Sequence, residues 1–186
     1  MGRRTTEQAD VGDADADFQD YVAARWPGLV RTAYLLTGDQ FLAEDLAQTT
    51  LTSVYASWRR VRRVEDVDAY VRRVLINANA GRFRKRRVVE HLVAAPQDDR
   101  AHAPHEPIAQ RSALMAALSE LPPRQRAVVV LRYWEDLSEQ EVAAVLGCST
   151  GTVKSQASKA LARLRTNSTL LDRDSMLAPV RREETE

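Results

Sequence analysis

The sequence predicts an all-α protein built from two small helical domains. Three observations predict this class. Apolar residues recur at helical spacing in several stretches of the chain. A stretch rich in proline, residues 89–110, separates two such patterned parts. Finally, the segment from Ser138 to Arg165 has the pattern of two short helices around a tight turn. At 186 residues, with 44% hydrophobic and 28% charged residues, the composition is that of a globular protein.

The segment from Ser138 to Arg165 predicts a helix-turn-helix. Ser138 and Glu141, three residues apart, form a capping box in which each side chain satisfies a backbone donor at a helix start. Gly147 can adopt the left-handed conformation that ends a helix, and Ser149 is placed to cap the next one. In such a motif the second helix enters the major groove of DNA.

The second helix of this motif has the composition of a DNA-binding helix. Residues 150–165 contain four cations and no acid. Away from its apolar positions lie Lys154, Ser155, Ser158 and Lys159, whose hydroxyl and ammonium groups suit base edges and phosphates. An ordinary helical hairpin with a solvated basic face is the alternative interpretation. The capping box, the glycine turn and the lack of acids favour DNA.

The first domain is predicted over residues 17–88, after an acidic segment, 1–16, that is predicted to be disordered. A first helical pattern begins at Phe18, and Pro27 is expected to kink or interrupt it. After a turn at residues 37–39, a second helix is predicted from Gln40 to Trp58.

A strongly basic region follows the second helix. From Arg59 to Arg87 there are eleven cations and three acids. Residues 59–66 read as a basic loop, with Asp66 placed to cap a helix that runs from Val67 to about Arg87. That helix ends in RFRKRR, where five of six residues are cations. The helix dipole alone favours cations at a C-terminus, but five exceed what it requires, so the stretch favours nucleic acid.

Residues 89–110 are predicted to be an interdomain linker, residues 111–167 the second domain and residues 168–186 a loose tail. A helix up to Leu121 is ended by two prolines, and the next helix spans residues 124–134. Its core candidates are Val128, Val129, Leu131 and Trp134.

The remaining residues exclude several classes of function. The chain contains no nucleophile with a base, no Gly-rich phosphate loop and no metal-ligand cluster, so we expect neither an enzyme nor a cofactor. His91, His102 and His105 lie in or beside the linker and receive no ligand role. Cys148 is a single cysteine and is interpreted as a small packing residue. Without an apolar run of about 18 residues or a signal peptide, a cytoplasmic protein is expected.

Three segments give the chain a family resemblance. They are AEDLAQTTLTSVYASW (residues 43–58), DAYVRRVLINANAGRFRKRR (residues 68–87) and the stretch that covers residues 118–165. In this order they resemble the extracytoplasmic-function (group four) sigma factors of bacterial RNA polymerase, in particular their actinobacterial SigE-type members. The resemblance covers residues 18–165.

The resemblance implies a promoter-specificity subunit with a sigma region 2 domain and a sigma region 4 domain. Glu44, Asp45, Gln48 and Thr49 would bind the clamp region of core polymerase. Asn77, Asn79, Arg82, Arg84, Lys85 and Arg86 would contact the minus-ten strand, and loop 59–66 would help to hold a flipped base. Lys154, Ser155, Ser158 and Lys159 would contact the minus-thirty-five duplex. The implied protein is a monomer outside the holoenzyme, and an anti-sigma factor commonly covers these surfaces in the family.

Two other classes compete with this interpretation. A stand-alone regulator with a C-terminal helix-turn-helix would bind an operator by itself, usually as a dimer on paired half-sites. Against it, the first domain shows no alternation of strands and helices and is itself basic. An adaptor whose basic helix binds RNA is the third class.

Overall fold

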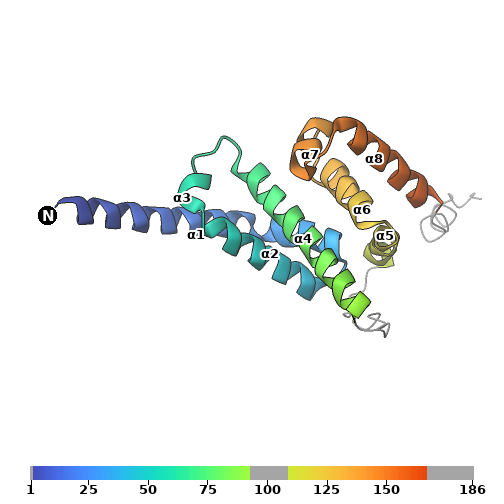
Figure 1. Ribbon diagram of the computed structural model, residues 1–186, viewed down its shortest axis with the longest axis horizontal. Helices are drawn as coiled ribbons and strands as arrows, with labels where there is room; N and C mark the ends of the chain where they lie inside the picture. Colours follow the sequence, from blue (N-terminus) through green and yellow to red (C-terminus); the bar gives the residue numbers. More distant parts are fainter. Residues whose placement is uncertain (1, 93–108, 167–186) are drawn as a thin grey trace, which may run out of the picture.

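The computed structural model describes residues 2–92 and 109–166, with side chains over residues 13–82 and 113–166. Every regular element in these ranges is a helix, as predicted (Figure 1). The N-terminal domain consists of α1 (Gly2–Thr37), α2 (Gln40–Tyr55), α3 (Trp58–Val61) and α4 (Val67–Leu92). The C-terminal domain consists of α5 (Ala109–Ser119), α6 (Pro123–Val129), the π-helical turn η1 (Val130–Trp134), α7 (Glu139–Leu146) and α8 (Thr150–Arg165).

In the N-terminal domain, α2 packs against both α1 and α4 (Figure 1). Gly38, with a φ of +82°, turns the chain between α1 and α2, a backbone conformation that favours glycine. The Asp39 carboxylate then caps α2 by accepting a hydrogen bond of 2.8 Å from the backbone N–H of Leu42. α2 turns its apolar side into the core, where it buries Ala43, Leu46, Ala47, Leu51 and Val54.

α1 begins at Gly2 and so runs through the acidic segment that the sequence predicts to be disordered. Ala14 is buried, and Asp15 accepts a hydrogen bond of 3.0 Å from the Tyr55 hydroxyl. Arg62 pairs with Asp13 at 3.1 Å and with Asp17 at 3.7 Å. These partners lie 40 or more positions later in the chain, so the local composition does not reveal them.

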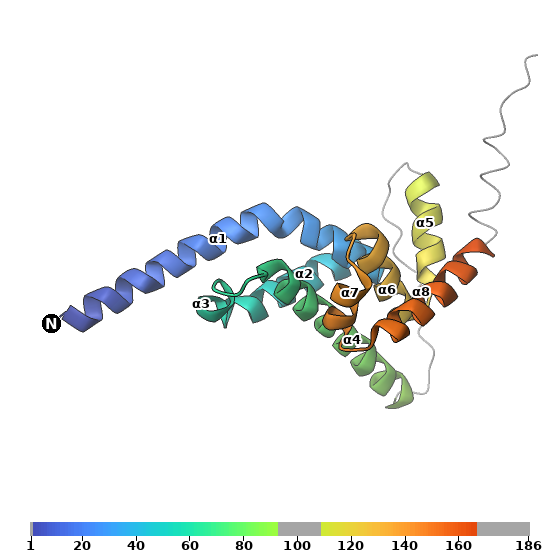
Figure 2. The ribbon, with the colours of Figure 1, turned by 90° about the horizontal axis from the view of Figure 1, so that it is seen from above.

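Pro27 lies inside α1 and does not end it. Figure 2 shows that the helix bends along its length. Proline has no N–H to give to the preceding turn, so a bend of this kind is the expected result.

α4 starts as predicted, because the backbone N–H of Ala69 donates a hydrogen bond of 2.7 Å to Asp66. The helix continues to Leu92, five residues beyond the predicted end at Arg87 and into the predicted linker. Val71 and Leu75 are buried in the core of the domain. α4 therefore carries the predicted basic stretch away from the bundle as a continuous helix (Figure 1).

The predicted helix 124–134 is divided into α6 and the π-helical turn η1. Val128, Val129 and Leu131 are buried as predicted, but Trp134 is 48% exposed. The wider i to i+5 pattern of a π-turn explains this difference, because it shifts later side chains off the face expected of an α-helix. The Trp134 ring lies instead beneath the guanidinium of Arg31, 5.9 Å from it.

The helix-turn-helix is present with the caps that the sequence predicts. The Ser138 hydroxyl accepts from the Glu141 N–H at 3.2 Å, and the Ser138 N–H donates to the Glu141 carboxylate at 2.7 Å. Gly147 ends α7 with a φ of +61°. Ser149 caps α8 by accepting from the Thr152 N–H at 3.2 Å. Cys148 packs against the core, as interpreted from the sequence.

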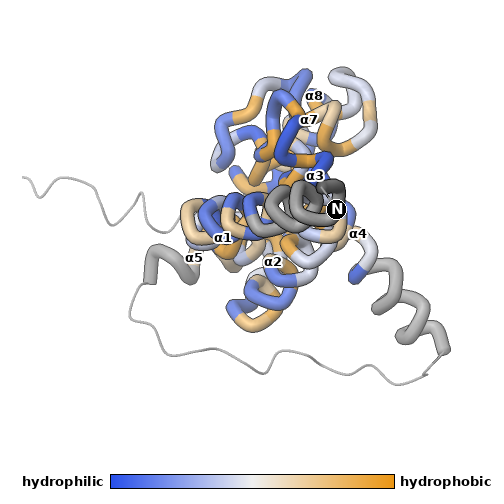
Figure 3. Tube along the Cα trace, turned by 90° about the vertical axis from the view of Figure 1, so that its left-hand side faces the viewer, coloured by the Kyte–Doolittle hydropathy of each residue, from blue (hydrophilic) through white to orange (hydrophobic). Residues whose placement is uncertain are grey.

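The two domains pack against each other. α7 contacts α4, and α6 and η1 contact α1 (Figures 1 and 2). Figure 3 shows hydrophobic and hydrophilic residues interspersed along the helices. Within the described part of the chain, no helix is long and apolar enough to cross a membrane.

Candidate polymerase-binding and nucleic-acid interface

The polar side of α2 brings together the four residues predicted to bind polymerase. Asp45, Gln48 and Thr49 are exposed, and Glu44 is half-buried. Glu44 accepts a hydrogen bond of 2.7 Å from the Gln40 side-chain amide. Residues at these spacings share one face of a helix across two turns. Because the opposite face of α2 fills the core, this polar face is fixed toward solvent.

The predicted minus-ten residues on α4 do not all lie on one face. Asn77 is exposed, whereas Asn79 is 6% exposed and lies in the interior. Two positions along a helix rotate a side chain by about 200°, so the two asparagines point in nearly opposite directions. Arg82 is half-buried and donates a hydrogen bond of 3.1 Å to the backbone carbonyl of Leu42. The side chains of Arg84, Lys85 and Arg86 lie outside the described residues.

The segment predicted as loop 59–66 begins inside α3 (Trp58–Val61), so its first three residues are helical, and it lies against the acidic part of α1. Arg62 is largely covered, with 16% of its side chain exposed, and its guanidinium pairs with Asp13 and Asp17. A cleft of about 390 Å³ lies beside this contact. Its lining residues are Ala14, Asp15, Tyr55, Ala56, Ser57, Trp58, Arg59 and Arg60. The basic loop therefore already has an anionic partner within the chain.

Asp13 and Asp17 were not singled out in the sequence, although a signal for them exists. They are four residues apart, which places them on one helix face. The neighbouring apolar face continues from Phe18, whose ring lies 4.9 Å from that of Tyr55 and 5.1 Å from that of Trp58. Extending the helical pattern of Phe18 back to Ala14 would have predicted this docking.

The outer face of α8 is exposed at all four residues predicted to meet the minus-thirty-five duplex. Lys154, Ser155, Ser158 and Lys159 are exposed, while Val153 on the opposite side is fully buried. The Lys154 ammonium lies 3.5 Å from the Glu139 carboxylate of α7. α8 thus presents hydroxyls and cations outward from a helix that the domain core holds in place.

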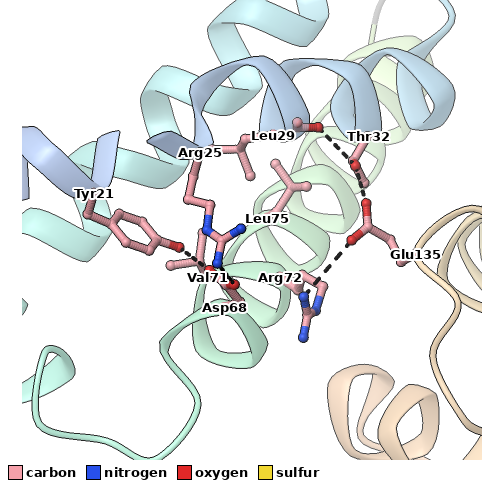
Figure 4. A pocket seen from close by; sticks show the side chains of 10 residues that line it. Tyr21, Arg25, Leu29, Thr32, Asp68, Val71, Arg72, Leu75 and Glu135 are labelled. Carbon is pink, nitrogen blue, oxygen red and sulfur yellow. Dashed lines mark hydrogen bonds and ion pairs between the residues drawn. The ribbon is translucent and has the colours of Figure 1, made fainter. Parts of the chain in front are cut away.

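A small cleft of about 140 Å³ lies between α1 and α4 (Figure 4). At one end, the Tyr21 hydroxyl donates a hydrogen bond of 2.9 Å to Asp68, which also pairs with Arg25 at 2.6 Å. Burial, together with the hydrogen bond to Asp68, raises the pKa of Tyr21 well above its usual value. The phenol therefore acts as a neutral donor that ties α1 to α4.

Within the described ranges, no group of three or more His, Cys, Asp or Glu side chains is arranged to hold a metal ion.

Comparison with known proteins identifies both domains. Residues 22–88 match the family described as Sigma-70 region 2, and residues 111–164 match Sigma-70, region 4. The RNA polymerase sigma-E factor of Streptomyces coelicolor is 42% identical over 174 residues, which cover 91% of this chain and 95% of that protein. The ECF RNA polymerase sigma factor SigE of Mycolicibacterium smegmatis is 36% identical over 144 residues, 73% of this chain and 55% of that protein. The chain belongs to the extracytoplasmic-function sigma factors.

Solved structures of the sigma factor RpoE and of CnrH share the fold. The sigma factor RpoE, crystallised with the anti-sigma factor NepR from Bartonella quintana, matches with a TM-score of 0.69 and 28% identity. That match covers 83% of this sigma factor and 96% of RpoE. CnrH, in complex with the cytosolic domain of CnrY, matches with a TM-score of 0.58 and 25% identity over 90% of this chain and 95% of CnrH. The resemblance stated from the sequence is therefore confirmed, and the stand-alone regulator is not favoured.

Proposed function

We propose that this sigma factor binds core RNA polymerase through the polar face of α2 and directs it to promoters. In this proposal α4 and loop 59–66 contact the minus-ten element, and α8 contacts the minus-thirty-five element. The observation that carries the proposal is that α2 and α8 each present an exposed polar or basic face, at the residues that the family resemblance assigns to these contacts. The chain initiates transcription as part of a holoenzyme and catalyses no reaction of its own.

The polymerase contact rests on the α2 face defined by Glu44, Asp45, Gln48 and Thr49. Its carboxylates and amide are positioned by a helix whose other side is buried, so the backbone that carries them needs no ordering on binding. An exposed acid such as Asp45 suits a basic groove on the partner and steers association. The clamp region of core polymerase is the partner that the family implies.

The DNA contacts need only modest affinity in each domain. Once region 2 is bound to polymerase, region 4 meets the promoter at a high effective concentration. Unstacking a base costs a few kcal/mol, which a protein pocket and nearby cations can offset. Loop 59–66 and the basic end of α4 supply such cations.

Run-off transcription with purified core polymerase and a promoter library tests the proposal. We expect specific transcripts only when the sigma factor is added, and loss of those transcripts with the double substitution Asp45→Ala and Gln48→Ala. The matched control is Gln19→Ala with Asp20→Ala, which removes the same two side-chain types from exposed positions on α1. A control protein that also fails, or transcripts that survive the α2 substitutions, would contradict the assignment of this face.

The stand-alone regulator makes the opposite prediction. Such a protein would shift a specific duplex by itself and would be insensitive to changes on α2. If the sigma factor neither co-elutes with core polymerase nor supports transcription, and yet shifts duplex DNA alone, the proposal fails.

We also propose an anti-sigma factor as a partner and a cytoplasmic location. Support comes from the similar sigma factor RpoE, whose solved structure is a complex with the anti-sigma factor NepR, and from CnrH, whose solved structure is a complex with the cytosolic domain of CnrY. Pull-down of the chain from its own cells, with and without added core polymerase, tests the partner. An inhibitor should be displaced as polymerase is added, because both are proposed to cover the same surfaces.

A further inference from the structure

The N-terminal part of α1 lies beside α3, and the two segments carry opposite charges (Figures 1 and 2). Residues 13–24 contain four acids and no cation. Residues 59–63, which run from α3 into the turn that follows it, contain four arginines and no acid. We call these four residues, Arg59, Arg60, Arg62 and Arg63, the basic surface. They belong to the segment that the proposed function assigns to the minus-ten strand.

One cation of the basic surface is covered by α1. The Arg62 guanidinium lies 3.1 Å from a carboxylate oxygen of Asp13 and 3.7 Å from one of Asp17, and only 16% of the Arg62 side chain is exposed. Asp13 and Asp17 are four residues apart, so they lie on one face of α1 and reach the same guanidinium. The other three arginines of the basic surface are exposed. The acids of α1 therefore cover one of the four cations.

Apolar contacts hold the two acids in this position. Ala14 is 3% exposed. The Phe18 ring lies 4.9 Å from that of Tyr55 and 5.1 Å from that of Trp58. Ala14 and Phe18 each follow one of the two acids in the sequence, so an apolar stripe runs along the helix beside the acidic one. Because the apolar stripe docks on α2 and α3, the acids are held toward the guanidinium.

The cleft of about 390 Å³ beside this contact has charges of both signs in its walls. Arg59 and Arg60 line it from α3, and Asp15 lines it from α1. The Asp15 carboxylate accepts a hydrogen bond of 3.0 Å from the Tyr55 hydroxyl, which fixes the carboxylate at the cleft. A phosphate that entered the cleft would meet two cations and one fixed anion. α1 thus places negative charge beside the cations that the proposed function assigns to a nucleic-acid strand.

The ion pairs at Arg62 are of a kind that a nucleic acid can displace. The side chains of Asp13 and Asp17 are 76% and 50% exposed, so water and salt screen their attraction for the guanidinium. A DNA strand offers several phosphates at once, and it releases counterions as cations neutralise them. Inside a holoenzyme the strand is also held close to region 2, at a high effective concentration. A contact that competes with unattached nucleic acid would therefore still yield to the promoter.

We propose that the acidic part of α1, residues 13–20, is an internal cover for the basic surface, in which Asp13 and Asp17 keep Arg62 from nucleic acid until polymerase presents a promoter strand. This inference rests on the proposed function, because it takes segment 59–66 as a nucleic-acid contact. The cover lowers the affinity of the free sigma factor for nucleic acid of any sequence. It therefore makes strand binding depend on the holoenzyme.

Fluorescence anisotropy of a labelled oligothymidylate of about 20 nucleotides, added to the free, full-length chain, tests the cover. This probe has no promoter sequence, so it reports the charge of the surface rather than base recognition. Asp13→Asn and Asp17→Asn each remove one acid from Arg62 and keep the size of the side chain. The control is Asp20→Asn, which removes the same charge about one turn further along α1, at an exposed residue without an ion pair to any described residue.

We expect Asp13→Asn and Asp17→Asn each to bind the probe up to about fivefold more tightly than the wild type at low salt, because exposed ion pairs have about this strength. In the double variant, the plot of log affinity against log salt concentration should be steeper by about 0.7, because one more phosphate is neutralised. Asp20→Asn should show a smaller gain and no steeper plot. In an Arg62→Gln background the first two substitutions should have no more effect than Asp20→Asn, because the cation that they release is gone.

Three outcomes would overturn the cover. One is an equal gain with Asp20→Asn, which would mean that net charge alone sets the affinity. The second is a gain that survives Arg62→Gln. The third is unchanged or weaker binding by Asp13→Asn and Asp17→Asn, and weaker binding would mean that the acids position the basic surface rather than cover it.

Run-off transcription with the wild type separates failure of the cover from failure of the proposed function. Specific transcripts together with any of these three outcomes would leave the function intact and refute the cover alone. If the wild type yields no transcript with core polymerase, the proposed function fails, while the anisotropy still shows whether the acids cover Arg62.

Discussion

Gly38 offers a direct test of how region 4 sits on region 2. It joins α1 to α2 with a φ of +82°, where an L side chain costs about 1–2 kcal/mol. A Cβ added there would also lie 3.3 Å from Nη2 of Arg126 and 3.9 Å from the methyl group of Met115. Because Arg126 is buried and hydrogen-bonded, we add about 1 kcal/mol for overpacking. Gly38→Ala should therefore lower the free energy of unfolding by about 2–3 kcal/mol.

Gly147→Ala is the matched control for backbone strain alone. Gly147 also has a positive φ, +61°, but nothing lies within 4 Å of an added Cβ. Its cost should be about 1–2 kcal/mol, without the packing term. Urea unfolding followed by tryptophan fluorescence measures both variants.

A double-mutant cycle isolates the contact with Arg126. In an Arg126→Ala background, the cost of Gly38→Ala should fall by about 1 kcal/mol, because the group that the new methyl meets is gone. An equal cost in both backgrounds would mean that Arg126 does not lie over Gly38. The docking of α6 on the end of α1 would then be refuted.

Three further perturbations test other parts of the structure. Phe18→Ala removes an edge-to-face contact with Trp58 at 5.1 Å and should lower the unfolding free energy by about 1–3 kcal/mol in thermal melts; an unchanged melt would show that this part of α1 is undocked. Val153→Ala leaves a cavity at a fully buried position on α8. It should lower the free energy of opening, measured by amide hydrogen exchange in region 4, by about 1–3 kcal/mol and leave the value for region 2 unchanged. The hydrogen bonds from Ser138 lower the pKa of Glu141, so its cap is complete above the ordinary value of 4.5 and is lost as pH falls through the lowered value. Amide exchange at the start of α7 should accelerate over that acid range, and Glu141→Gln should remove the pH dependence.

Local sequence signals predicted the elements whose determinants are local. The capping box of α7, the glycine at its end and the serine that starts α8 all lie within twelve residues, and each forms the predicted contact. The cap of α4 by Asp66 is of the same kind. Helical periodicity also placed Ala47, Leu51 and Val54 on the buried face of α2, although the helix ends at Tyr55, which is 50% exposed, rather than at Trp58. In these cases the chain's propensity and its packing agree.

The differences arise where distant residues decide the outcome. Acidic composition predicted a disordered N-terminus, but Arg62 and a cluster of aromatic rings hold that part of α1 as a helix. Trp134 was expected in the core, but a π-turn carries it to the surface. Asn79 shares a motif with Asn77, yet it lies on the opposite side of α4 and is buried. Spacing alone separates Asn77 from Asn79 and extends the apolar pattern of Phe18 back to Ala14, but it does not say which side of each helix is covered, because that depends on which helix packs against which.

The domain interface combines apolar packing with a few charged contacts, because buried apolar residues of both domains belong to one hydrophobic cluster. The apolar part gains free energy in proportion to the surface it buries. Buried charged contacts contribute little net stability, because desolvation offsets much of their attraction, but they strongly disfavour any docking that leaves them unpaired. Arg126 on the end of α1 and Glu135 between Thr32 and Arg72 therefore specify the geometry in which the two domains meet, while the apolar contacts around them supply the larger part of its stability.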